Sequence, residues 1–131
     1  MIIDSSALVA IMFAEGDAAI YARAIRAARE RSISAVNYVE TAVVIDGRRD
    51  PVISRRFDDL LHEASIIIEP FDENQAHVAR EAYRDFGKGS GHPARLNFGD
   101  CFAYALARCR GEPLLFKGDD FRQTDVTPAL P

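Results

Sequence analysis

Short apolar runs that alternate with longer segments of helical periodicity restrict the fold of this chain more than any other feature. The runs lie at 1–4, 31–34, 65–70 and 113–116. Between them, apolar residues recur at helical spacing over about 5–13, 17–29, 36–47 and 97–110, and in two further segments that begin at Asp50-Pro51 and at Asp72. Such alternation favours right-handed βαβ crossovers and a parallel sheet covered on both faces. The sequence therefore predicts the α/β class, with residues 1–131 forming one domain, a three-layer α/β/α sandwich around a central, mostly parallel sheet.

Three segments carry more detailed expectations. The run at 65–70 is apolar like a central parallel strand and ends at a proline. Asp125-Val126 is a candidate for a last edge strand. The helix at 36–47 is expected to bury one side, and its β-branched content leaves a strand as the alternative. The residues on that side are Val36, Val39, Val43 and Val44.

The composition is that of an ordinary soluble domain, with 48% apolar residues, 27% charged residues and a formal net charge of −4. The charge argues against broad electrostatic adhesion to nucleic acid, but carboxylates that bind divalent cations reverse their own local sign. No segment approaches the roughly 18 uncharged apolar residues of a membrane span, and the start lacks a basic leader. We therefore expect a cytoplasmic protein with no membrane contact. Cys101 and Cys109 share one predicted helix, too far apart for a disulfide, and are expected to be free thiols.

Asp4 ends the first apolar run, and two serines follow it directly. In open α/β sheets, ligands bind outside the carboxyl ends of the strands, which is where this carboxylate is expected to lie. The alternative is that Asp4 only caps the helix that begins at the next residues.

Glu40 and Asp100 are acids on predicted helices in apolar surroundings. Glu40 shares a side with Val36, Val43 and Val44, and a carboxylate buried there needs a proton, a partner or a metal ion. Asp100 lies in the first turn of its helix between Phe98 and Phe102. An acid near a helix N-terminus is favoured by the helix dipole, so capping is again the alternative.

Asp119 and Asp120 follow the last predicted strand, as Asp4 follows the first. Adjacent acids are also common in ordinary turns. The combination is more informative than its members, because acids from strand ends and from helices can converge on one edge of the sheet. Carboxylates held together repel one another unless protons or cations intervene. An oxygen-only cluster of this kind suits Mg²⁺ or Mn²⁺.

Other catalytic or binding patterns are weak in this sequence. The three histidines are isolated and no Cys-x-x-Cys is present, which argues against a zinc site. The glycine-rich segment 87–91 lacks the preceding strand and the Gly-Lys-Ser/Thr ending of a phosphate-binding loop. Ser5 and Ser6 have no obvious histidine partner, so a serine nucleophile is disfavoured.

Four stretches together resemble one known family. They are Ile-Ile-Asp-Ser-Ser-Ala-Leu at the start, Val-Glu-Thr-Ala around Glu40, Leu-Asn-Phe-Gly-Asp-Cys-Phe-Ala-Tyr-Ala-Leu-Ala at 96–107 and Leu-Leu-Phe-Lys-Gly-Asp-Asp-Phe at 114–121. In these stretches the chain resembles PIN-domain proteins of the VapC toxin type, and the resemblance extends over essentially its whole length. It implies a Mg²⁺- or Mn²⁺-dependent ribonuclease that is the toxin of a type II toxin–antitoxin pair. The partners it implies are an RNA substrate, a second copy in a homodimer and a VapB-like antitoxin, with DNA contacted only through the antitoxin.

The resemblance also implies roles for individual residues. Carried over by position, the acidic cluster of the family falls on Asp4, Glu40 and Asp100, with either Asp119 or Asp120 as the fourth acid. Ser6 resembles a helix-start hydroxyl that supports the site, and Asn97 belongs to the same motif as Asp100. The loop at 87–93 is one residue longer than is usual in the family and lacks an arginine, which concerns substrate contacts rather than catalysis.

These observations lead us to expect phosphodiester hydrolysis assisted by one or two cations, which lower the pKa of a bound water and stabilise charge on the phosphate. Two alternatives stay open. A phosphatase with an aspartate nucleophile also begins with an acid after a strand, but it requires a second aspartate where Ser6 stands. A metal-responsive receiver or binding module would bind a cation without cutting a strand.

Overall fold

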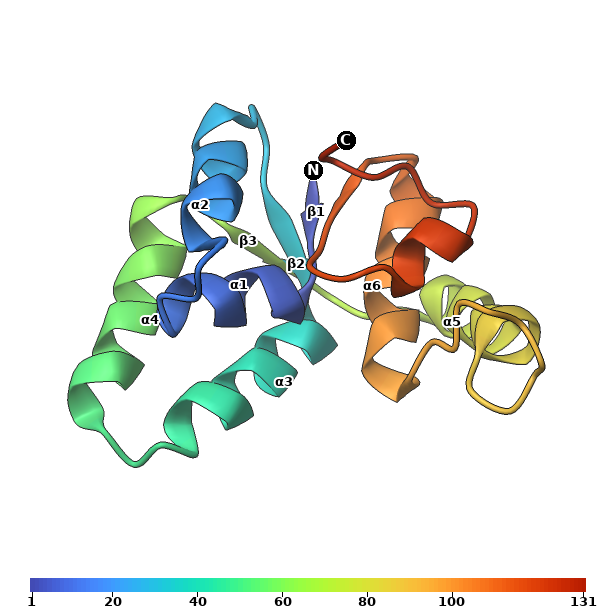
Figure 1. The fold of residues 1–131 in the computed structure, drawn as a ribbon, viewed down its shortest axis with the longest axis horizontal. Coiled ribbons are helices and arrows are strands. Elements are labelled where there is room, and N and C mark those ends of the chain that lie inside the picture. The colour runs from blue at the N-terminus through green and yellow to red at the C-terminus, as the bar shows by residue number, and fades with distance from the viewer.

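Four parallel strands in the order β3-β2-β1-β4 form the central sheet of the computed structural model, which describes residues 1–131. The strands are β1 (Ile2–Ile3), β2 (Ser32–Ser34), β3 (Ile67–Glu69) and β4 (Leu114–Leu115). Ile2 of β1 lies opposite Ser32 on one side and Leu114 on the other. Parallel neighbours require crossover connections, and helices supply each of them (Figure 1). The predicted alternation of strands and helices is confirmed.

The helices are α1 (Ser5–Met12), α2 (Ala18–Ala27), α3 (Ala35–Asp46), α4 (Pro51–Glu63), α5 (Glu73–Phe86) and α6 (Phe98–Arg110), followed by the short 3₁₀ helix η1 (Asp120–Gln123). Each α-helix except α2 begins after a side chain that accepts a hydrogen bond from a first-turn amide. Asp50 and Asp72 accept hydrogen bonds from first-turn amides of α4 and α5, the two helices that the sequence predicted to begin at these residues. Gly111 ends α6 in the left-handed conformation, with φ of 63°, which favours glycine.

Two hydrophobic cores lie on opposite faces of the sheet and define three layers. Ile2 belongs to the core beneath α5 and α6, whereas Ile3 belongs to the core beneath the other four helices. This split follows from the alternation of side chains along a strand. Figure 1 shows α1 to α4 gathered on one side of the strands and α5 with α6 on the other. The predicted α/β/α sandwich is therefore confirmed.

The prediction for the buried side of α3 is wrong. Asn37, Thr41 and Ile45 are its buried residues, whereas Val39 and Val43 are 55% and 67% exposed. Val44 is exposed as well, and Val36 is only half-buried. The reason is that α3 buries polar side chains, which form hydrogen bonds next to α6. The spacing of the apolar residues therefore predicted the wrong buried side of the helix.

Two strand predictions also need correction. The strand at Ile67–Glu69 is an edge strand and not a central one, and Ile67 and Ile68 are both exposed. Asp125 and Val126 do not form a strand; Pro128 instead makes an isolated parallel bridge with Leu114.

Two further observations concern the whole chain. Cys101 is buried and Cys109 exposed, and both are free thiols, as predicted. None of the helices combines the length and the apolar character needed to cross a membrane.

Candidate active site

Four predicted acids lie near the carboxyl ends of the strands, close enough for the charges of three of them to act on the fourth, Asp100. Asp4 directly follows β1 and is 4% exposed, Glu40 projects from α3, Asp100 lies in the first turn of α6, and Asp120 begins η1. The charges of Asp4, Asp120 and Glu40 all act on Asp100 and raise its pKa. The structure thus brings together side chains that are up to 116 positions apart in the sequence. Asp119, the other candidate for the fourth acid, is exposed and makes no hydrogen bond or ion pair through its carboxylate.

Ser6 holds the Asp4 carboxylate. Both the backbone N–H and the hydroxyl of Ser6 donate to Asp4 Oδ2, at 2.9 and 2.5 Å. The same hydroxyl oxygen accepts the N–H of Lys117, 3.0 Å away, which ties the start of α1 to the segment after β4. Burial, and to a smaller extent the charge of Glu40, raises the pKa of Asp4 to about 6, although the bonds from Ser6 oppose that rise. Asp4 therefore caps α1, and no cationic side chain pairs with its buried carboxylate.

Asn97 and Asp100 form a capping box at the start of α6. Asn97 Oδ1 accepts the N–H of Asp100 and Asp100 Oδ2 accepts the N–H of Asn97, both at 2.9 Å. Burial is the largest cause that raises the pKa of Asp100, to about 7, and the neighbouring carboxylates add to it. Capping occupies only Oδ2, so Oδ1 makes no hydrogen bond within the chain and faces no competing protein donor.

Glu40 is held by Ser5 and Asn37, neither of which was predicted to be a site residue. The Ser5 hydroxyl donates to Glu40 Oε1 at 2.5 Å, and Asn37 Nδ2 donates to the same oxygen at 3.3 Å. Asn37 Nδ2 also donates to the Gly99 carbonyl at 3.0 Å, which joins α3 to α6. Glu40 lies beside these polar side chains and not on a buried valine side, so that part of the prediction is wrong.

Gly99 is the closest neighbour of the Glu40 carboxylate. A Cβ atom on Gly99 would lie 1.8 Å from Glu40 Oε2, far inside van der Waals contact. Only a residue without a side chain lets Glu40 approach α6 next to Asp100. The signals available in the sequence were the glycine directly before Asp100 and the position of Asn37 one helical turn before Glu40.

The donor set suits a hard divalent cation, since all its ligand atoms are carboxylate oxygens. A cation would also relieve the burial and repulsion that raise the pKa of Asp4 and Asp100. As the side chains stand, no three acidic, histidine or cysteine residues lie close enough together to hold an ion. Binding would require carboxylates to move together, and Asp100 Oδ1 and Glu40 Oε2, which have no hydrogen-bond partner in the chain, can do so.

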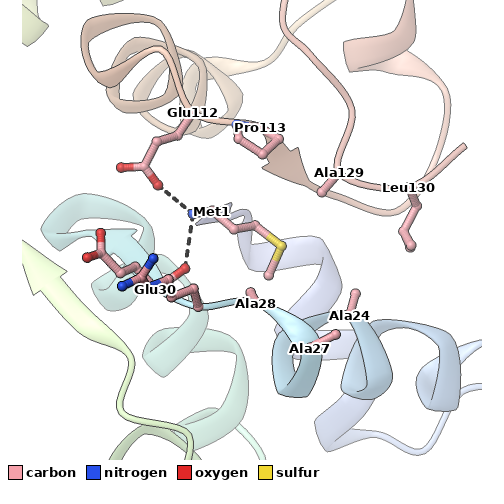
Figure 2. A pocket seen from close by; sticks show the side chains of 10 residues that line it. Met1, Ala24, Ala27, Ala28, Glu30, Glu112, Pro113, Ala129 and Leu130 are labelled. Carbon is pink, nitrogen blue, oxygen red and sulfur yellow. Dashed lines mark hydrogen bonds and ion pairs between the residues drawn. The ribbon is translucent and has the colours of Figure 1, made fainter.

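The opposite ends of the strands carry a different arrangement. The amino group of Met1, at the other end of β1 from Asp4, forms an ion pair with Glu112 and donates to the Glu30 carbonyl at 3.0 Å (Figure 2). Met1 also lines a hollow of about 770 Å³ with largely apolar walls. No predicted site residue lines this hollow, so it is separate from the acidic cluster.

The raised pKa of Asp4 predicts a pH-dependent stability in metal-free protein. Because the folded state holds a proton that the unfolded chain releases near pH 4, the free energy of unfolding falls as the pH rises from about 4 to about 6. The shift corresponds to roughly 3 kcal/mol. Asp4→Asn keeps an acceptor for Ser6 but removes this dependence, so it should match the parent chain at pH 4 and be more stable at pH 7.5.

Urea unfolding of both chains in EDTA at several pH values tests this expectation. A stability difference between them that is the same at pH 4 and pH 7.5 would contradict it.

Comparisons with known proteins found a matching family and similar chains. A family model described as the PIN domain matches residues 1–126. Ribonuclease VapC28 of Mycobacterium tuberculosis is 57% identical to this chain over 130 residues, which cover 99% of this chain and 98% of that protein.

Two solved structures share the fold. VapC20 of Mycobacterium tuberculosis, described as a sarcin-ricin loop cleaving toxin, superimposes with a TM-score of 0.70 at 18% identity, covering 97% of this chain and 98% of that one. A chain of a toxin–antitoxin complex from Klebsiella pneumoniae superimposes with a TM-score of 0.68 at 16% identity, covering 92% and 88%. At these identities the likeness concerns the fold alone.

Proposed function

The chain belongs to the PIN-domain family and to its VapC-type members, and on that basis we propose that it is an endoribonuclease, the toxin of a type II toxin–antitoxin pair. The observation that carries the proposal is the convergence of Asp4, Glu40, Asp100 and Asp120 at the carboxyl ends of the strands. The naming of VapC28 as a ribonuclease supports the activity, since the two chains align over nearly their whole lengths.

We propose Asp4, Glu40, Asp100 and Asp120 as the residues that hold Mg²⁺ or Mn²⁺ and carry the reaction. A cation bound there would supply a water of lowered pKa and neutralise charge on the phosphate. Ser6 keeps Asp4 oriented through two hydrogen bonds, and Asn97 keeps Asp100 oriented through the capping box. No histidine or serine nucleophile takes part, which fits the absence of a histidine from the hydrogen bonds of Ser5 and Ser6.

Asp120 is our choice for the fourth acid. The charge of Asp120 is one of the main causes that raise the pKa of Asp100, whereas Asp119 is not among those causes. Asp119 remains the alternative because the two are adjacent at the end of β4. Only one of them is expected to be essential for cleavage.

We further propose two protein partners, a VapB-like antitoxin and a second copy of the chain in a homodimer, with DNA reached only through the antitoxin. The Klebsiella pneumoniae chain with the same fold was solved in a toxin–antitoxin complex, which supports the antitoxin as a partner. The exposed Val39 and Val43 on α3, next to Glu40, form an apolar surface suited to a protein partner. A cytoplasmic location, where cellular RNA is present, belongs to the same proposal.

Cleavage of total cellular RNA by the purified chain tests the function. We expect discrete fragments with Mg²⁺ or Mn²⁺ and none with EDTA. In the same assay, Asp120→Asn should lower the cleavage rate at least about 10-fold, whereas its neighbour Asp119→Asn should stay within about 3-fold of the parent chain.

The outcomes separate the competing functions. Metal binding without strand scission would favour the non-catalytic module, and hydrolysis of a phosphomonoester alone would favour the phosphatase. A large loss in Asp119→Asn with a normal rate in Asp120→Asn would reverse our assignment of the fourth acid.

A further inference from the structure

Lys117 joins the segment after β4 to the turn between α1 and α2. Its ammonium forms ion pairs with Glu15 and with Asp17 Oδ1, the second at 3.1 Å, although both acids lie 100 or more positions away in the sequence. The hydroxyl of the buried Tyr21 donates to Asp17 Oδ2 at 3.1 Å, so Asp17 is itself held in place. The hydrogen bonds to the two carboxylates raise the pKa of Lys117, which keeps the ammonium charged. We call Lys117, Glu15 and Asp17 the Lys117 clamp.

The backbone of Lys117 lies next to the acidic cluster. Its N–H donates to Ser6 Oγ at 3.0 Å, and the same hydroxyl donates to Asp4 Oδ2. Three residues later η1 begins at Asp120, whose charge acts on Asp100. Figure 1 shows the orange-red chain turning beside the start of α1 before it enters η1. The segment after β4 therefore approaches two acids of the cluster from a single anchoring point.

Residues 117–120 have few other contacts that fix their position. All four are exposed, and Gly118 adopts a φ of 95°, which favours glycine. Within this segment only Lys117 makes a side-chain hydrogen bond or ion pair. At the far end the next residue, Phe121, is buried. The segment is thus held between Phe121 and the Lys117 clamp, and loss of either end leaves it free to shift.

The Lys117 clamp acts on the cluster by position and not by charge. None of its three residues is among the main causes that shift the pKa of Asp4 or Asp100. Exposed ion pairs also contribute little to the stability of a fold, so global stability does not explain the arrangement. The geometry of a cation site is more sensitive, because Mg²⁺ demands near-ideal octahedral placement of its oxygen ligands.

We propose that Lys117 is a positioning residue of the active site: by binding Glu15 and Asp17 it holds residues 117–120 where Asp120 can join Asp100 around a divalent cation. The inference rests on the proposed function of the acidic cluster and adds a residue outside the cluster on which it depends. As the side chains stand, the acids are too far apart to hold an ion. The affinity for the cation therefore depends on how far Asp120 must move, and this distance is set by the Lys117 clamp.

The first test measures the Kd for Mn²⁺ at pH 7.5 from the electron paramagnetic resonance of the free ion. Lys117→Met keeps the length of the side chain but not its charge, and it should raise this Kd at least about 10-fold. The KM for RNA at saturating Mn²⁺ should stay within about 3-fold of the parent value. Lys117→Arg restores a cation for both carboxylates and should keep the parental Kd. Lys88→Met, which removes the other lysine of the chain, exposed and without an ion pair, is the matched control and should leave the Kd unchanged.

A second set of variants keeps the lysine and removes its partners. The double variant Glu15→Gln/Asp17→Asn should weaken Mn²⁺ binding as much as Lys117→Met does. Adding Lys117→Met to that double variant should change the Kd by less than about 3-fold, because the residues act as one unit. A lysine that bound RNA phosphate directly would instead be freed by the double variant, and the KM for RNA would fall.

Amide hydrogen exchange in EDTA gives a readout that needs neither metal nor cleavage. The N–H of residue 117, which donates to Ser6 Oγ, should exchange at least about 10-fold faster in Lys117→Met than in the parent chain. The N–H of Asp4, which donates to the Leu115 carbonyl at 2.9 Å, is the internal control and should exchange at the same rate in both. Equal urea midpoints for the two chains would show that the change is local.

Each result either supports or overturns the inference. A parental Kd for Mn²⁺ in Lys117→Met, or unchanged exchange at residue 117, would overturn it. A raised KM for RNA with a parental Kd would assign Lys117 to phosphate binding and would overturn it as well. If the parent chain bound Mn²⁺ with the expected dependence on Lys117 but cut no RNA, the positioning role would stand and the proposed ribonuclease would fail.

Discussion

Asp100→Asn is expected to lower RNA cleavage by about 100-fold or more while making the metal-free protein more stable at pH 7.5. Asparagine keeps an acceptor for the Asn97 N–H, so the capping box at the start of α6 survives. What is removed is a carboxylate whose pKa is raised to about 7 by burial and by Asp4, Asp120 and Glu40. Above pH 7 that carboxylate is ionised against its surroundings, so its loss stabilises the fold.

The two effects have opposite signs, which distinguishes a site residue from a structural one. Cleavage rates and urea unfolding would be measured for the parent chain, Asp100→Asn and Asp58→Asn, the last an exposed aspartate on α4. Saturating Mg²⁺ should stabilise the parent chain, by about 2.7 kcal/mol at 100 times Kd, and Asp100→Asn much less. Full activity, or unfolding of Asp100→Asn at pH 7.5, would refute the proposed role.

Gly99→Ala is expected to reduce cleavage by about 10-fold or more although it adds only a methyl group. The new Cβ would lie 1.8 Å from Glu40 Oε2, so the carboxylate must leave its place. Its departure breaks the hydrogen bonds from Ser5 and Asn37 to Glu40 Oε1. A displacement of about 1 Å at a catalytic group is enough for losses of this size.

A double-mutant cycle tests whether the effect passes through Glu40. Glu40→Ala removes every atom of Glu40 that the new Cβ approaches, so adding Gly99→Ala to Glu40→Ala should change activity by less than about 3-fold. Gly16→Ala is the matched control, because a Cβ on Gly16 meets nothing within 4 Å. Equal losses from Gly99→Ala in both backgrounds would mean that the methyl group distorts α6 itself.

Local signals account for most of what could be predicted. Asp50, Asp72 and Asn97 stand directly before helices and cap them, because a cap needs only a short polar side chain and the next three amides. Asp4 and Asp100 were identifiable for the same reason: one follows a strand and the other opens a helix. Each contact lies within a few residues of the acid that makes it.

The errors arose where packing between distant segments decides burial. Val39, Val43 and Val44 of α3 are exposed because Asn37 and Thr41 face the interior. A helix that buries polar side chains has no apolar pattern from which its buried side can be predicted. The strand at 67–69 reads as central from its isoleucines, but its place in the sheet depends on which strands pair. Periodicity measures the composition of a segment and does not specify its neighbours.

By itself, the sequence determined the order of strands and helices, the ends of those helices and the acids that follow β1 and open α6, because these depend on neighbours along the chain. Only the tertiary structure decided that the Glu40 carboxylate lies against Gly99, that the charges of Asp4 and Asp120 act on Asp100, and that Phe98 stays largely exposed. Those three outcomes depend on how closely α3, α6 and η1 approach one another. That approach is set by packing across the sheet, where residues far apart in sequence exclude or admit one another by size and charge.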